Sequence, residues 1–104
     1  MKEKWQTGIL LIYWLKKPSK LTKRKVISAL INEQTGNLKF IKALKPNIII
    51  YAIRNLRLEE VERRVERALT LEFKVPVKVE ALPALLLTKA LNEALIAYKE
   101  LKSR

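Results

Sequence analysis

Two continuous apolar runs constrain the fold of this chain more than any other feature. They are "ILLIYWL" at residues 9–15 and "NIIIYAI" at residues 47–53. Both are rich in the β-branched and aromatic residues that favour strands, and both are far shorter than the roughly 20 apolar residues needed to cross a bilayer. A strand that is apolar at successive positions is typical of burial on both faces. We therefore expect two central strands of one sheet, in a soluble protein without a membrane-spanning segment.

Two other stretches have the pattern of edge strands. "NLKFIK" at residues 37–42 and "VPVKVEAL" at residues 75–82 alternate between apolar and polar positions. Alternation indicates that one face of a strand meets water. The lysines in both stretches, and Pro76 in the second, favour the outside of a sheet because proline cannot donate to a central ladder.

Apolar residues at helical spacing predict three helices. The first covers about residues 22–34, with Thr22 as its N-cap and Gly36 as its C-terminal stop. The second covers residues 58–72. The third is an amphipathic helix at residues 83–102, which begins at a proline.

The element order is therefore β-α-β-β-α-β-α, in an α+β protein. Two interleaved β-α-β units give a ferredoxin-like βαββαβ sandwich with sheet order 4-1-3-2. We expect one domain over residues 1–104, because 104 residues with 49% hydrophobic and 31% charged composition suit one globular unit. The helix at 83–102 is expected to cover the open face of the sheet or to form a dimer interface, since exposed apolar sheet would aggregate.

The positive charge is concentrated in the first half of the chain. The formal net charge is +12; residues 1–56 carry twelve Lys and Arg against two Glu, whereas residues 57–104 carry ten against eight. A field this asymmetric attracts polyanions.

The densest basic stretch is "KKPSKLTKRK" at residues 16–25, with six cations and no acid. Its last three cations fall in the first turn of the predicted helix, where the helix dipole disfavours each one by about 0.3–1 kcal/mol. A phosphate bound at the helix N-terminus would reverse that effect, and a solvated basic loop is the alternative interpretation. More lysines follow in the edge strand and its turn, where they could instead block strand addition. The predicted nucleic-acid-binding residues are Lys16, Lys17, Lys20, Lys23, Arg24, Lys25, Lys39, Lys42 and Lys45.

Three aromatic residues lie near these cations. Tyr13 and Trp14 adjoin the basic stretch, as aromatics do in proteins that stack single-stranded bases, but neighbours on a strand point to opposite faces and such residues are usually core. Trp5 lies in the N-terminal arm, where it either caps the end of the sheet or folds onto a partner.

The residues of most catalytic and metal sites are missing from the sequence. There is no Cys, His or Asp, which removes disulfides, the usual metal ligands and the usual general base. With only Gly8 and Gly36, a glycine-rich phosphate loop is excluded. In the second helix, Glu59 with Arg63 and Glu60 with Arg64 are pairs four residues apart. They predict a salt-bridged, solvated outer face. We expect no enzyme activity, no cofactor and no metal, in a cytoplasmic protein whose composition fits a thermophile.

The leading functional hypothesis is a small basic protein that binds DNA or RNA through phosphates, with weak sequence specificity. The alternative is a protein-interaction or assembly module that dimerises through its sheet or its C-terminal helix. A third hypothesis is a small anionic metabolite at the N-terminus of the first helix. The sequence leaves open which nucleic acid is bound, whether it is single- or double-stranded, and whether the protein is a homodimer.

Overall fold

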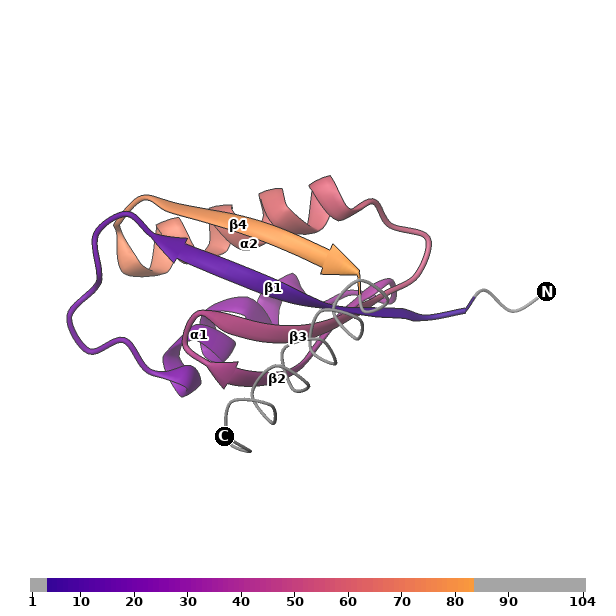
Figure 1. Cartoon of the computed structure of the whole chain (residues 1–104), viewed down its shortest axis with the longest axis horizontal. Helices are drawn as coiled ribbons and strands as arrows, with labels where there is room; N and C mark the ends of the chain where they lie inside the picture. The colour runs from indigo at the N-terminus through magenta and orange to yellow at the C-terminus, as the bar shows by residue number, and fades with distance from the viewer. Residues whose placement is uncertain (1–3, 84–104) are drawn as a thin grey trace, which may run out of the picture.

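A computed structural model describes residues 4–83 of the chain (Figure 1). The predicted helix at 83–102 lies almost entirely outside the described residues. The elements are β1 (Gln6–Trp14), α1 (Lys23–Leu30), a short 3-10 helix (Ile31–Glu33), β2 (Leu38–Lys45), β3 (Ile48–Ile53), α2 (Leu58–Phe73) and β4 (Val77–Pro83).

The four strands form one antiparallel sheet in the order β2-β3-β1-β4. Read from the β4 edge, this is the order 4-1-3-2 that the element pattern predicts. The two continuous apolar runs are the central strands β1 and β3, and the two alternating stretches are the edges. The protein is therefore α+β, with a four-stranded antiparallel sheet and two helices in the described part of the chain.

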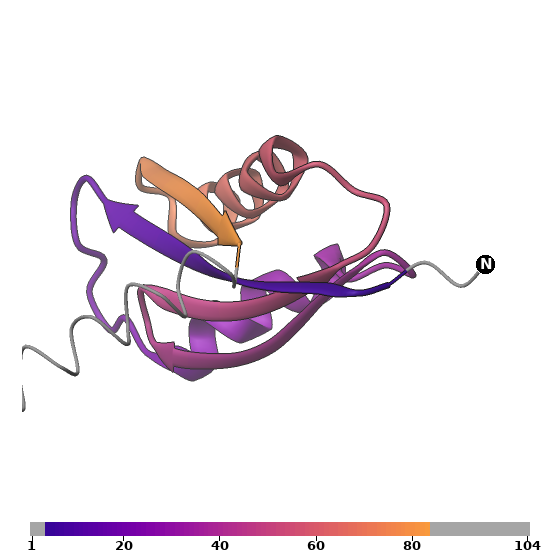
Figure 2. The same cartoon turned by 45° about the vertical axis from the view of Figure 1, so that its right-hand side comes forward.

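Both described helices pack on the same face of the sheet (Figures 1 and 2). The core lies between them and the sheet. On α2, residues four apart along one stripe are fully buried, and each contributes about 1.5–3 kcal/mol by leaving water; they are Val61, Val65 and Leu69. They face side chains from the strands and from α1, including Leu10, Ile49, Val26 and Leu30.

Helix α1 begins where the sequence predicts and ends earlier. The Thr22 hydroxyl accepts a hydrogen bond from the Lys25 N–H at 3.2 Å, which is N-cap geometry. The helix stops at Leu30 and tightens into the 3-10 helix, rather than continuing to residue 34. The side chain of Gln34 accepts a hydrogen bond from the Phe40 N–H at 2.9 Å. This contact ties residue 34 to β2, so the chain has to leave the helix before it.

The outer edge of β4 is closed by carboxylates from α2. Glu66 accepts a hydrogen bond from the Val79 N–H at 2.9 Å, and Glu62 accepts one from the Ala81 N–H at 2.8 Å. Because β4 is an edge strand, these N–H groups would otherwise be open to another strand. The two glutamates therefore protect this edge as well as satisfying its donors.

The outer face of α2 is only partly ion-paired as predicted. Glu60 and Arg64 form a salt bridge at 3.1 Å. The expected Glu59–Arg63 pair is not a salt bridge in the described structure, so that expectation was wrong. Arg67 pairs with Glu33 at 3.6 Å, which links α2 to the 3-10 helix.

Candidate nucleic-acid interface

All nine cations that the sequence predicts as binding residues are exposed. None of them forms a salt bridge within residues 4–83. Between residues 4 and 58 the only acid is Glu33, and that carboxylate is engaged by Arg67. The described acids therefore leave this positive charge without a partner.

The three lysines of β2 lie on one face of the sheet. Lys39, Lys42 and Lys45 are three residues apart, so a regular strand would place them on alternating faces. Two register irregularities in β2, one between residues 40 and 42 and one between 43 and 45, change this. Each lysine lies directly opposite a β3 residue of the face away from the helices, and the partners in order are Ala52, Ile50 and Ile48.

We call these three residues the lysine row. Because their β3 partners are two residues apart, neighbouring lysines are spaced by about 7 Å along the strand. This spacing is close to that between successive phosphates of an extended nucleic-acid strand. The row runs along an edge of the sheet, where it also discourages pairing with another strand.

The other six cations lie on the β1–α1 loop and the first turn of α1. Lys16, Lys17 and Lys20 are on the loop, and residues 23–25 open the helix. The first turn of α1 contains no acid. Lys20 has φ 60°, in the left-handed region, which costs a non-glycine residue about 1–2 kcal/mol. The loop therefore keeps its lysine in a conformation that local preferences disfavour.

The basic loop and one end of the lysine row meet at the same end of the molecule. Lys17 of the loop lines a cavity together with Pro46 and Asn47, which directly follow Lys45. Lys39 lies at the far end of the row, roughly 14 Å away by strand geometry. The structure thus joins the loop to Lys45 and places Lys39 apart from them.

Trp5 caps the far end of the sheet. The Lys39 Nζ lies 5.0 Å from the centre of its ring, and the Arg54 guanidinium lies 4.7 Å from it. Arg54 also donates a hydrogen bond to the Gly36 carbonyl at 3.0 Å. Of the two roles that the sequence left open for Trp5, the described contacts are those of a cap, held by cation-π attraction.

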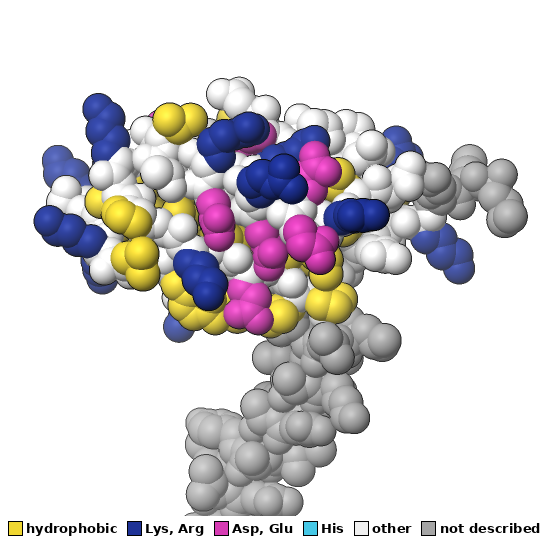
Figure 3. All heavy atoms as spheres, turned by 90° about the horizontal axis from the view of Figure 1, so that it is seen from above, with side chains coloured by type: hydrophobic (Ala, Val, Ile, Leu, Met, Phe, Trp, Pro, Cys, Tyr) yellow, Lys and Arg dark blue, Asp and Glu magenta, His cyan; other side chains and the backbone are white. Residues whose placement is uncertain are grey.

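The surface over α2 has a different character from the basic end. Figure 3 shows acidic and basic side chains mixed across the middle of one face, and only basic ones at its left-hand end. That end carries the β1–α1 loop and the α2–β4 connection in Figure 1. Opposite charges offset each other over α2, whereas the basic end presents an unbalanced positive field.

Tyr13 and Trp14 point to opposite faces of the sheet. Trp14 packs edge-on against Phe73, with ring centres 5.1 Å apart and planes at 76°. Tyr13 is 47% exposed on the face away from the helices, and its hydroxyl donates to Glu80 at 3.4 Å. The two aromatics therefore do not form one stacking platform.

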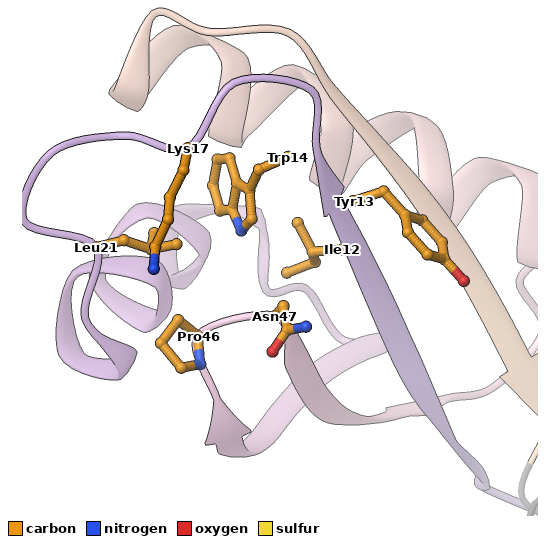
Figure 4. A pocket seen from close by; sticks show the side chains of 7 residues that line it. All are labelled: Ile12, Tyr13, Trp14, Lys17, Leu21, Pro46 and Asn47. Carbon is orange, nitrogen blue, oxygen red and sulfur yellow. The ribbon is translucent and has the colours of Figure 1, made fainter.

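A cavity of about 460 Å³ lies between the basic loop and the β2–β3 turn (Figure 4). The sequence indicated Lys17 and Trp14 as candidates near this place but no role for Pro46 and Asn47, which form the turn after β2. No sequence pattern shows that this turn faces the basic loop, because the two are brought together by the sheet. The lining residues are Ile12, Tyr13, Trp14, Lys17, Leu21, Pro46 and Asn47.

Within residues 4–83, no three His, Cys, Asp or Glu side chains come together as a metal site. Neither described helix is long and apolar enough to cross a membrane.

Comparisons with protein-family models, with curated proteins and with solved structures found no match to this chain.

Proposed function

We propose that this chain is a small, non-catalytic protein that binds nucleic acid mainly through phosphates. The observation that carries the proposal is the set of nine exposed cations without a described acidic partner. They form two adjoining surfaces, the basic β1–α1 segment and the lysine row. We further assign the fold to the ferredoxin-like class, because two interleaved β-α-β units give this strand order with both helices on one face.

The chemistry of these side chains suits phosphates better than base edges. Eight of the nine cations are lysines, which act as point charges, whereas arginine supplies the bidentate geometry that reads guanine. Contacts of this kind position a protein on the backbone and carry little sequence information. We therefore expect weak sequence specificity.

Binding as a function of salt concentration tests the proposal. The triple variant Lys17→Gln, Lys42→Gln, Lys45→Gln removes three cations from the interface. The matched variant Arg57→Gln, Arg63→Gln, Arg67→Gln removes three exposed cations on or beside α2, away from the basic end. Each lost phosphate contact should reduce the slope of log affinity against log salt by about 0.9 on duplex DNA, or about 0.7 on single strands.

The expected result is a slope flatter by about two to three units for the first variant and a much smaller change for the second. Equal effects of the two variants would mean that net charge alone drives binding. Failure to bind any DNA or RNA at low salt would refute the proposal.

The sheet face that neither described helix covers favours a second candidate function, an assembly module. On the face away from the helices, Ile50, Ile9 and Leu82 form one row across three strands, and Ile48 lies opposite Leu11 in the next. A continuous apolar sheet face of this kind is typical of a surface that another element covers.

We propose a second copy of the chain as the partner in this assembly module. β4 ends at Pro83, directly opposite Gly8 of the central strand β1, and 21 residues follow it. A segment of that length that leaves beside a central strand can reach the open face of a neighbouring copy. Sedimentation at high concentration should then show twice the 12.1 kDa chain mass, and a monomer under all conditions would exclude it.

A further inference from the structure

We propose that the cavity at the basic end holds one unpaired nucleotide, so that the protein prefers single-stranded nucleic acid. This inference rests on the proposed nucleic-acid binding and names the form of the partner. It depends on one buried donor, one exposed cation and the position of the cavity relative to the lysine row.

The cavity has the size and walls of a small-ligand site. Its volume of about 460 Å³ is within the usual range for pockets that take small molecules. Ile12, Leu21 and Pro46 supply apolar walls, and they come from β1, the β1–α1 loop and the β2–β3 turn (Figure 4). Three separate segments therefore shape the site, and flat apolar groups such as nucleobases suit such walls.

The indole N–H of Trp14 is a buried donor without a partner in the described structure. Figure 4 shows the indole nitrogen turned toward the space above Ile12 and Pro46. An indole N–H can only donate, and a buried donor is costly to leave unpaired. The nitrogen has almost no solvent-accessible surface, so a base that enters the cavity meets it only after a lining side chain shifts. The group that satisfies it must be an acceptor, and every nucleobase offers a carbonyl oxygen or a ring nitrogen.

The ammonium of Lys17 supplies a positive charge at the cavity, where it can contact the phosphate of the bound nucleotide. Figure 4 shows the Lys17 ammonium turned into the same space, beside Leu21. The lysine row ends at Lys45, the residue before Pro46, which lines the cavity. A single-stranded nucleic acid whose phosphates lie along the lysine row would therefore place its next nucleotide at the cavity.

A base that is paired and stacked within a duplex cannot enter this cavity unless it is first unpaired and moved out of the duplex. Enzymes and binders that take a base into a pocket either unpair it or bind strands that are already single. Single-strand binders combine a basic track with pockets or aromatic surfaces for the bases. The lysine row and the Trp14 cavity supply these two parts, which predicts single-strand preference.

Tryptophan fluorescence provides the test, because the chain contains only Trp5 and Trp14. In the Trp5→Phe variant, Trp14 is the sole reporter. Titration with oligothymidylate should quench its emission, while a duplex of the same length should not. The substitution Trp14→Phe keeps an aromatic ring against Phe73 but removes the N–H, and it should weaken oligothymidylate binding about tenfold without changing duplex binding.

A second variant avoids any loss of core packing. Asn47 is exposed in the β2–β3 turn and lines the cavity, so Asn47→Phe should fill the cavity while leaving the fold intact. It should also abolish the preference for single strands. Equal affinity of wild type for both forms, with no quenching of Trp14, would overturn this inference while leaving nucleic-acid binding in place. No binding of either form would overturn both proposals.

Discussion

The phenol ring of Tyr51 lies over the backbone of Gly8. The two residues are directly opposite each other on β3 and β1. The Tyr51 hydroxyl reaches past Gly8 and donates a hydrogen bond to the Leu82 carbonyl of β4 at 3.1 Å. One side chain thus ties three strands together, and it does so only because the residue beneath it has no Cβ.

Replacing Gly8 with alanine should destabilise the protein strongly. A Cβ at this position would lie 2.6 Å from Cζ of Tyr51 and would also collide with the Leu82 carbonyl. Because one of these obstacles is the backbone of β4, the sheet itself has to move. We therefore expect the free energy of unfolding, measured with urea, to fall by about 2–3 kcal/mol. Gly36→Ala is the control, since nothing lies within 4 Å of a Cβ there, and its effect should stay within about 0.5 kcal/mol. Equal effects at both glycines would contradict the packing described.

The protein should lose stability between about pH 10 and 12 because of Tyr51. Burial raises the pKa of the Tyr51 phenol to about 12, and the negative charge of Glu62 adds to the rise. Below pH 10 the phenol is protonated in both the folded and the unfolded chain, so its contribution is complete. Between the two pKa values the unfolded chain releases this proton while the folded chain keeps it, so the free energy of unfolding falls by about 1.4 kcal/mol per pH unit. Above pH 12 the loss levels off.

The Tyr51→Phe variant isolates the contribution of this phenol from every other effect of high pH. In wild type, tyrosinate absorbance should show one phenol that ionises about two units late, and the variant should lack that phase. The fall in stability over this pH window should be shallower in the variant by the amount that Tyr51 contributes. Identical pH profiles for the two proteins would contradict the prediction.

Removing the carboxylate of Glu66 should weaken the β4 edge. Glu66→Ala leaves the Val79 N–H without its acceptor, and a hydrogen bond to a charged group contributes about 1.5–3 kcal/mol, less where water can replace it. We expect a loss of about 1 kcal/mol in the free energy of unfolding and faster hydrogen exchange at the Val79 amide. Glu66→Gln retains a carbonyl acceptor and should behave closer to wild type. Glu72→Ala, an exposed acid on the same helix, should leave the Val79 amide unchanged.

Deleting residues 84–104 should produce a protein that aggregates. The sheet face that neither described helix covers carries Ile9, Leu11, Ile48 and Ile50, and the deleted residues contain an apolar stripe at helical spacing. Without that segment, the face should bind hydrophobic dyes and drive association. A truncated chain that stays folded, monomeric and free of dye binding would show that this segment does not cover the sheet.

The sequence alone determined the order of the elements from β1 to β4 and the arrangement of the sheet. Two runs apolar at successive positions require burial on both faces, so they became the central strands, and strands with lysine and proline became the edges. Thr22 marked the start of α1 because an N-cap is a local hydrogen bond. Nine cations without nearby acids in the sequence also identified the basic surface, since charge is visible in composition.

Tertiary structure decided how these parts face one another. The irregularities in β2 that bring Lys39, Lys42 and Lys45 onto one face arise from pairing with β3, and a local pattern of alternation would have separated them. Glu62 and Glu66 belong to the charged helix α2, yet their carboxylates accept hydrogen bonds from backbone N–H groups of β4, which lies further along the chain. The cavity beside Trp14 exists because the sheet brings residues 46 and 47 to the basic loop. In each case the deciding contacts join residues distant in sequence, so neither periodicity nor charge could have revealed them.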